Sequence, residues 1–279
     1  MKLGICTSDY PVQSLDSLCD SIEQVGFSQV QFSFETIGEE ELPAIIKLDQ
    51  IKQINRAFEA RDLEMTAING TFNAIDPDLN RREEGIKRFA VMAEACDSLN
   101  CKILTICTGT RNPQGMWQDH PDNASEQAWR DMIKTVYALA EIAEKHQIFL
   151  GVETEASNVV STPKLARRLL DEINSPRLKI IMDCANLFHK GKAVPDNVRP
   201  TISSAFDYLG HDIILAHGKD IYASEGIDFA TPGKGILDYP YFLKLLEQYN
   251  YQGGMILHGC ETPEDIPAAA DFMRRCITF

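Results

Sequence analysis

Several features are missing from this sequence, and each absence excludes a class of protein. No stretch approaches the roughly 18 uninterrupted apolar residues of a membrane-spanning helix, so we expect no membrane partner. The first residues lack a basic segment followed by a long apolar run, so no secretory signal is expected and we interpret the protein as cytoplasmic. No low-complexity tract or change of composition marks a boundary, which predicts one domain over residues 1–279.

Basic residues are scarce relative to acidic ones. The chain has 27 Lys and Arg against 41 Asp and Glu, which gives a formal net charge of −14. Such a balance favours solubility and opposes binding to phosphate backbones. We therefore expect no nucleic-acid partner.

Paired cysteine motifs are also lacking. The eight cysteines contain no Cys-x-x-Cys pair and no dense framework. We expect free, mostly buried thiols in a reducing compartment, and little thiolate for metal binding.

The dominant pattern that is present alternates short apolar runs with longer segments of helical periodicity. The predicted strands cover residues 2–6, 28–34, 64–69, 102–107, 147–153, 177–183, 212–217 and 253–258. The predicted helices cover residues 13–25, 48–62, 80–98, 123–146, 161–174, 197–209, 238–249 and 263–277. Eight strand–helix units in strict order favour an α/β fold of the (β/α)8 TIM barrel type, and an open doubly wound sheet is the alternative.

Four predicted strands end in residues that can bind a metal ion. They are Glu153, Asp183, His217 and His258, separated by 30, 34 and 41 residues, which is about the length of one strand–helix–strand unit. In a barrel these strand ends curve around one point, whereas in an open sheet the outer two would lie too far apart to share an ion. The spacing therefore favours the barrel and a single metal site. A single residue of this kind would more often be a helix cap or a surface ion pair.

Short strings around these positions resemble the xylose isomerase-like TIM barrel superfamily, and within it the sugar and sugar-phosphate isomerase and epimerase branch. The strings are Gly-Val-Glu at 151–153, Asp-Cys-Ala-Asn at 183–186, His-Gly-Lys-Asp at 217–220, Gly-Lys-Gly-Ile-Leu-Asp-Tyr at 233–239, Gly-Thr-Phe-Asn at 70–73 and Cys-Thr-Gly-Thr-Arg at 107–111. Each is weak alone, but their order and spacing are specific to the superfamily. They do not specify a substrate.

The resemblance implies a divalent metal held by Glu153, Asp183 and His217, which match the family's ligands on strands five to seven. The family's fourth ligand, a glutamate on strand eight, is replaced by His258, and Glu261 follows three residues later. We take His258 as the fourth ligand, with Glu261 as the alternative. Two imidazoles and two carboxylates favour a transition metal, so the expected cofactor is one Mn²⁺ ion, with Mg²⁺, Co²⁺, Zn²⁺ or Fe²⁺ as alternatives.

The activity that the resemblance implies begins with removal of a proton next to a carbonyl, through a metal-stabilised enediolate. Return of the proton to the neighbouring carbon isomerises a sugar, whereas delivery from the opposite face epimerises it. We expect Glu153 to be the main acid/base, with Glu261 or His258 as its counterpart. The predicted function is isomerisation or epimerisation of a small sugar or sugar phosphate.

Further polar residues follow the same strands and are candidates for substrate binding. Lys219 could hold a hydroxyl, carboxylate or phosphate, Arg111 is the best anion contact, and Trp117 could cover the sugar. For Arg111, a structural ion pair is an equally good interpretation. The remaining candidates are Glu155, Asn158, Asn186 and His189.

Three alternative functions remain open. A keto-polyol dehydratase would use the same scaffold and the same proton abstraction. An endonuclease IV-like phosphodiesterase is less favoured, because strand three is followed by Asn69 and Asn73 and strand four ends in Cys107, so its histidine-rich zinc set cannot be assembled. A sugar-binding barrel without catalysis is the third. The expected partner is a small carbohydrate, and the resemblance implies a possible homo-oligomer.

Overall fold

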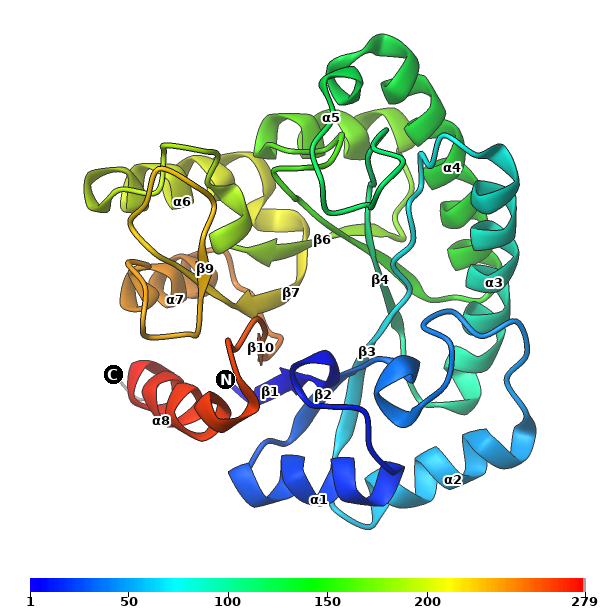
Figure 1. The fold of residues 1–279 in the computed structure, drawn as a ribbon. Coiled ribbons are helices and arrows are strands. Elements are labelled where there is room, and N and C mark those ends of the chain that lie inside the picture. Colours follow the sequence, from blue (N-terminus) through cyan, green and yellow to red (C-terminus); the bar gives the residue numbers. More distant parts are fainter. Residues whose placement is uncertain (278–279) are drawn as a thin grey trace.

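The structure is a computed structural model that describes residues 1–277. Its centre is a closed barrel with the strand order β1-β10-β7-β6-β5-β4-β3-β2, and all neighbouring strands are parallel (Figure 1). The strands are β1 (Leu3–Cys6), β2 (Gln29–Phe32), β3 (Glu64–Asn69), β4 (Ile103–Cys107), β5 (Phe149–Glu153), β6 (Leu178–Asp183), β7 (Ile213–Gly218) and β10 (Met255–Leu257). The predicted barrel is confirmed, and the open sheet is wrong because β1 pairs with β10.

Helices alternate with these strands and form a ring around the barrel (Figure 1). They are α1 (Leu15–Val25), α2 (Leu48–Glu59), α3 (Leu79–Ser98), α4 (Glu126–Lys145), α5 (Pro163–Ile173), α6 (Pro195–Leu209), α7 (Tyr239–Gln248) and α8 (Ile266–Ile277). Several starts have side-chain caps: Ser125, Thr162 and Asp238 each accept a hydrogen bond from a backbone N–H in the first turn. The observed elements differ from the predicted ranges only near their ends.

Two apolar clusters hold the barrel together. The large one packs strand residues against the helices, whereas the small one consists of strand residues such as Ala67, Ile181 and Leu215. Because side chains alternate across a strand, the small cluster fills the interior of the barrel and closes the floor of the cavity above it. The eight cysteines are all free, and six of them are buried. Within residues 1–277, no helix combines the length and hydrophobicity needed to cross a bilayer.

A small hairpin after β7, not predicted from the sequence, extends one side of the barrel mouth. Strands β8 (Asp220–Ile221) and β9 (Phe229–Ala230) pair antiparallel. The carboxylate of Asp220 accepts hydrogen bonds from the backbone N–H groups of Gly233, Gly235 and Leu237. Gly235 permits this approach, since a Cβ there would lie 2.2 Å from Asp220 Oδ1. Asp220 therefore fixes the loop that carries Lys219 and Phe229.

The substitution Asp220→Ala is expected to lower the free energy of unfolding by about 3 kcal/mol, because it leaves several buried backbone N–H groups without acceptors. Urea denaturation measures this loss. The matched control is Asp228→Ala in the same loop, where the side chain is exposed and little change is expected. Equal losses in the two variants would contradict the role given to Asp220.

Candidate active site

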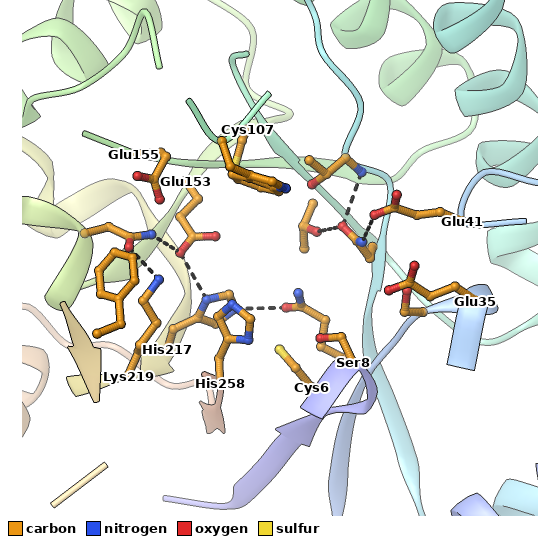
Figure 2. Close-up of a pocket in the computed structure, with 18 residues that line it drawn as sticks. Cys6, Ser8, Glu35, Glu41, Cys107, Glu153, Glu155, His217, Lys219 and His258 are labelled. Carbon is orange, nitrogen blue, oxygen red and sulfur yellow. Dashed lines mark hydrogen bonds and ion pairs between the residues drawn. The ribbon is translucent and has the colours of Figure 1, made fainter. Parts of the chain in front are cut away.

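The carboxyl ends of the barrel strands surround a cavity of about 470 Å³ (Figure 2). This volume is typical of small-molecule sites, and the position is the one used by TIM-barrel enzymes. Its lining includes four carboxylates, two histidines and one lysine, namely Glu35, Glu41, Glu153, Glu155, His217, His258 and Lys219. The ionisable groups of the cavity are therefore mainly acidic.

Glu153, Asp183 and His217 come together at one side of this cavity. They end or nearly end the adjacent strands β5, β6 and β7, and Asp183 and His217 are direct register partners. One ligand atom from each lies within 4.8 Å of the others. His217 Nδ1 is 3.4 Å from Glu153 Oε1 and 3.9 Å from Asp183 Oδ2. The structure thus brings together three of the four predicted metal ligands.

The hydrogen bonds around this group leave the inward-facing atoms without partners. His217 Nε2 lies 2.9 Å from Gln31 Oε1 and donates to it, so in the neutral imidazole that a metal ion requires Nδ1 presents a lone pair. Asp183 Oδ1 accepts from the backbone N–H of Ala185 at 2.9 Å. In contrast, Asp183 Oδ2 and His217 Nδ1 are buried and have no hydrogen-bond partner among residues 1–277. Two buried acceptors facing each other, beside a carboxylate, fit a divalent cation.

Asn186 and Lys219 connect this group to the adjacent wall. Asn186 donates to Glu153 Oε1 at 2.8 Å and accepts from Lys219 Nζ at 2.6 Å. Lys219 Nζ also lies 3.6 Å from Asp183 Oδ2 and 3.7 Å from the centre of the Phe229 ring. Burial alone would lower the pKa of Lys219, but the surrounding carboxylates raise it above its usual value. Lys219 therefore supplies a fixed positive charge.

The pKa of Glu153 reflects the same surroundings. Burial would raise it, but His217 and Lys219 lower it to about 2. The pKa of Asp183 is raised, chiefly by burial, although Lys219 opposes this. At neutral pH Glu153 is thus a carboxylate able to accept a proton.

His258, predicted as the fourth metal ligand, lies beside this group but is not one of its three candidate ligands. Its Nδ1 faces Asp9 Oδ1 at 3.3 Å, and its ring centre is 5.6 Å from that of His217. The buried carboxylate of Asp9 also accepts from the backbone N–H groups of Gly259 and Cys260. Burial opposes a charge on His258, yet Cys6 and Asp9 raise its pKa well above its usual value. Because burial keeps Cys6 a neutral thiol, Asp9 is the group that supports the charge.

Glu261 was predicted as a possible catalytic counterpart, but it does not line the cavity. Its carboxylate accepts from Tyr222 at 3.0 Å and lies 3.5 Å from Lys234. Its backbone N–H donates to Thr231. These contacts hold Glu261 at the rim, near the start of α8.

Arg111 is a structural residue and not an anion contact. One guanidinium nitrogen donates to the Ile75 carbonyl at 3.2 Å, and another is paired with Asp131 of α4. Its side chain is 15% exposed and is not part of the cavity lining. The structural interpretation of Arg111 therefore replaces the phosphate-binding one.

Asn158 and His189 also lie outside the lining of this cavity, contrary to their prediction as substrate contacts. Asn158 accepts from the backbone N–H of Gly109 at 2.6 Å and donates to the Met116 carbonyl at 3.1 Å. His189 Nε2 lies 3.0 Å from the Ser161 carbonyl. Both residues fix neighbouring loops of the barrel mouth.

Glu155 and Trp117 do line the cavity. Glu155 is buried, which raises its pKa, although Lys219 opposes the shift. Trp117 is 58% exposed on the long loop after β4, where its ring can cover a ligand. Both positions are compatible with the predicted substrate contacts.

Sequence reasoning missed the opposite half of the cavity, contributed by the first three strand–helix units. Ser33, Glu35, Glu41 and Asn69 all line it. Their only signal in the sequence is that polar residues end or follow the strands at 29–32 and 64–69, which is also true of ordinary loops.

A family model described as xylose isomerase-like TIM barrel matches residues 19–276. Inosose dehydratases are similar to this chain as well. The one from Glaesserella parasuis is 19% identical over 203 residues, which cover 66% of this chain and 66% of the relative. The one from Clostridium perfringens is 20% identical over 226 residues, covering 76% of this chain and 75% of the relative. The first match thus spans just under two thirds of that relative's length.

Solved structures resemble the whole chain. A 3-keto-D-glucoside 4-epimerase from E. coli has a TM-score of 0.74 at 20% identity and covers 100% of both chains. An IolI protein with a bound zinc atom has a TM-score of 0.74 at 17% identity, covering 99% of this chain and 96% of the other. At these identities the likeness demonstrates the shared fold.

Proposed function

The chain belongs to the xylose isomerase-like TIM barrel family, and we propose that it is a metal-dependent enzyme that removes a proton next to the carbonyl of a small carbohydrate. The reaction we favour is isomerisation or epimerisation. The observation that carries this proposal is the convergence of Glu153, Asp183 and His217, with two buried unpartnered acceptor atoms, in the cavity at the barrel mouth.

A divalent ion held by Glu153, Asp183 and His217 would act as a Lewis acid on the carbonyl and make the adjacent proton more acidic. The earlier preference for Mn²⁺ depended on two imidazoles, and His258 faces Asp9 instead. Two carboxylates and one imidazole suit Mn²⁺, Fe²⁺, Co²⁺ and Zn²⁺, so the native metal is to be found by direct analysis.

Glu153 is the proposed base. Its low pKa keeps it deprotonated, and the hydrogen bond from Asn186 fixes its carboxylate. Lys219 and Asn186 are placed to donate hydrogen bonds to oxygen atoms of a substrate. Glu155 lines the same wall and would accept from a hydroxyl.

His258 is the proposed counterpart that delivers a proton. It enters the cavity from the end of β10, whereas Glu153 enters from β5 (Figure 2). Its pairing with Asp9 favours the protonated imidazole. His258 can therefore donate a proton, whereas the deprotonated Glu153 can only accept one. Epimerisation needs such a pair of groups with opposite protonation.

The second candidate is a keto-polyol dehydratase, which is supported by the similarity of this chain to proteins named inosose dehydratase. Glu153 would again take the proton next to the carbonyl. Protonated His258 would then donate to the hydroxyl on the following carbon, which leaves as water. A phosphodiesterase is disfavoured, because residues 1–277 contain one group of candidate metal ligands and a cavity rich in carboxylates.

Deuterium exchange from heavy water tests the proposal. Ketoses, keto-inositols and their phosphates are incubated with the metal-loaded protein and followed by NMR and mass spectrometry. We expect a deuteron at a carbon next to the carbonyl of at least one compound, and no exchange after removal of the metal with a chelator. Loss of water would identify the dehydratase, and absence of exchange throughout would refute the proposal.

A further inference from the structure

The half of the cavity facing Glu153 has its own set of polar groups. Figure 2 shows Glu35 and Glu41 across the cavity from Glu153 and Lys219. Ser33 and Asn69, which also line the cavity, directly follow β2 and end β3. We call Ser33, Glu35, Glu41 and Asn69 the distal group.

Ser33 is the clearest indication that this group binds a ligand. Its backbone N–H donates to Thr7 at 2.8 Å, and its carbonyl accepts from Thr36 at 2.6 Å. The residue is 2% exposed, yet its hydroxyl is buried without any hydrogen-bond partner. A rigidly held hydroxyl without a partner is costly unless a ligand supplies one.

Glu41 is positioned by Asn69 at the same side of the cavity. Asn69 donates to Glu41 Oε1 at 2.8 Å and itself accepts from the Thr71 backbone N–H at 3.2 Å. Glu35 and Glu41 are both exposed residues, and partial desolvation of Glu41 within the cavity, together with the nearby charge of Glu35, raises the pKa of Glu41. The negative charges of Glu35 and Glu41 repel each other. Hydroxyl groups that donate hydrogen bonds to these carboxylates would stabilise them, whereas an anion would increase the repulsion.

Among residues 1–277, no lysine or arginine lines the cavity beside these carboxylates. In the part of the chain that the structure describes, Lys219 is the single lysine or arginine lining the cavity, and it is paired with Asn186 and Asp183. Arg111, the predicted phosphate contact, is turned towards Asp131.

We propose that the distal group binds the hydroxyl groups of an uncharged polyhydroxylated ketone and excludes its phosphorylated form. The inference rests on the proposed function, because it places the reacting carbonyl near Glu153 and the remaining hydroxyls near Ser33 and Glu41. It thereby selects free sugars or polyols over sugar phosphates.

The test compares each free ketose with its terminal phosphate, for example D-fructose with D-fructose 6-phosphate, and keto-inositols with ketose phosphates of equal carbon number. The readouts are deuterium exchange and, independently, binding by isothermal titration calorimetry. We expect the best free compound to exchange deuterium at least tenfold faster, and to bind at least tenfold more tightly, than the best phosphate. A phosphate that binds and exchanges better would overturn the inference while leaving the proposed function intact.

Variants test whether the distal group is responsible for the preference for free over phosphorylated compounds. Glu41→Gln is expected to raise KM for the free compound about tenfold with a smaller effect on kcat. Glu39→Gln makes the same charge change at a neighbouring position outside the cavity lining and should have no effect. Ser33→Ala should also weaken binding while the melting temperature stays the same or rises, since it removes a hydroxyl that has no partner. A lower melting temperature with unchanged affinity would make Ser33 a structural residue and contradict its role.

If no compound exchanges deuterium, the proposed function fails and calorimetry alone decides the inference. Tighter binding of free compounds by the wild type, weakened in Glu41→Gln, would support it. Equal binding of free and phosphorylated compounds would overturn it.

Discussion

Replacing Glu153 by glutamine will slow deuterium exchange at the substrate carbon by a factor of about 10²–10⁴, the range typical of losing a general base. Glutamine preserves the shape of the side chain and an oxygen for Asn186, but it cannot take a proton. The exchange rate, measured by NMR at saturating substrate and metal, checks this expectation. Glu141→Gln, an exposed position on α4, is the matched control and should retain full activity.

The stability of the Glu153→Gln variant provides a second readout. Because the folded pKa of Glu153 is lowered to about 2, its carboxylate stabilises the fold above the ordinary carboxyl pKa of 4.5, and this contribution is lost as the pH falls towards 2. The wild type should therefore be the more stable protein at neutral pH, and the difference should shrink below about pH 4. Full exchange activity in Glu153→Gln would remove this residue from the proposed chemistry.

Removing the carboxylate of Asp183 will strongly reduce the response of the protein's melting temperature to metal. A saturating divalent ion is expected to raise the melting temperature of the wild type by roughly 5–10 °C, since it binds only the folded state. Asp183→Asn should eliminate most of this shift, because Oδ2 is one of the two buried acceptors without a partner. Replacing a residue that only hydrogen-bonds to a metal ligand typically lowers the metal affinity by about 10–100-fold, so removing a direct ligand should lower it by at least as much.

The measurement is differential scanning fluorimetry with Mn²⁺, Mg²⁺, Co²⁺, Zn²⁺ and Fe²⁺ in turn, together with metal analysis of the purified protein. Glu155→Gln is the informative control, because Glu155 lines the same cavity but lies outside the group of three ligands. Its metal response should match that of the wild type. Equal responses in the wild type and Asp183→Asn would show that the ion binds elsewhere.

Local sequence patterns predicted the barrel and the position of three ligands. Glu153, Asp183 and His217 follow apolar strands whose register is set by parallel neighbours, so their convergence follows from closing the sheet. The roles of the strand-eight residues depend instead on distant partners. His258 faces Asp9, which is 249 residues away in sequence, and the positive φ of 73° at Gly259 turns the chain so that Glu261 points to the rim.

The role of Arg111 likewise depends on a residue that is distant in the sequence. The glycine-containing turn around it suits an anion, but the carboxylate of Asp131 on α4 occupies its guanidinium. The distal group was missed for another reason: serine, asparagine and glutamate at strand ends are common in solvated loops. Only the three-dimensional structure shows that Ser33 is buried without a partner and that Glu41 faces the cavity.

The contacts of Asp9 also determine when the cavity at the barrel mouth can form during protein synthesis. Its partners, residues 258–260, leave the ribosome roughly 12–50 s later at ordinary elongation rates. Until β10 joins β1, the edges of β1 and β7 remain open and the carboxylate of Asp9 lacks its stabilising donors. A nascent chain that stalls before these residues emerge would contain every proposed metal ligand, but its barrel would not be closed and the cavity would be incomplete.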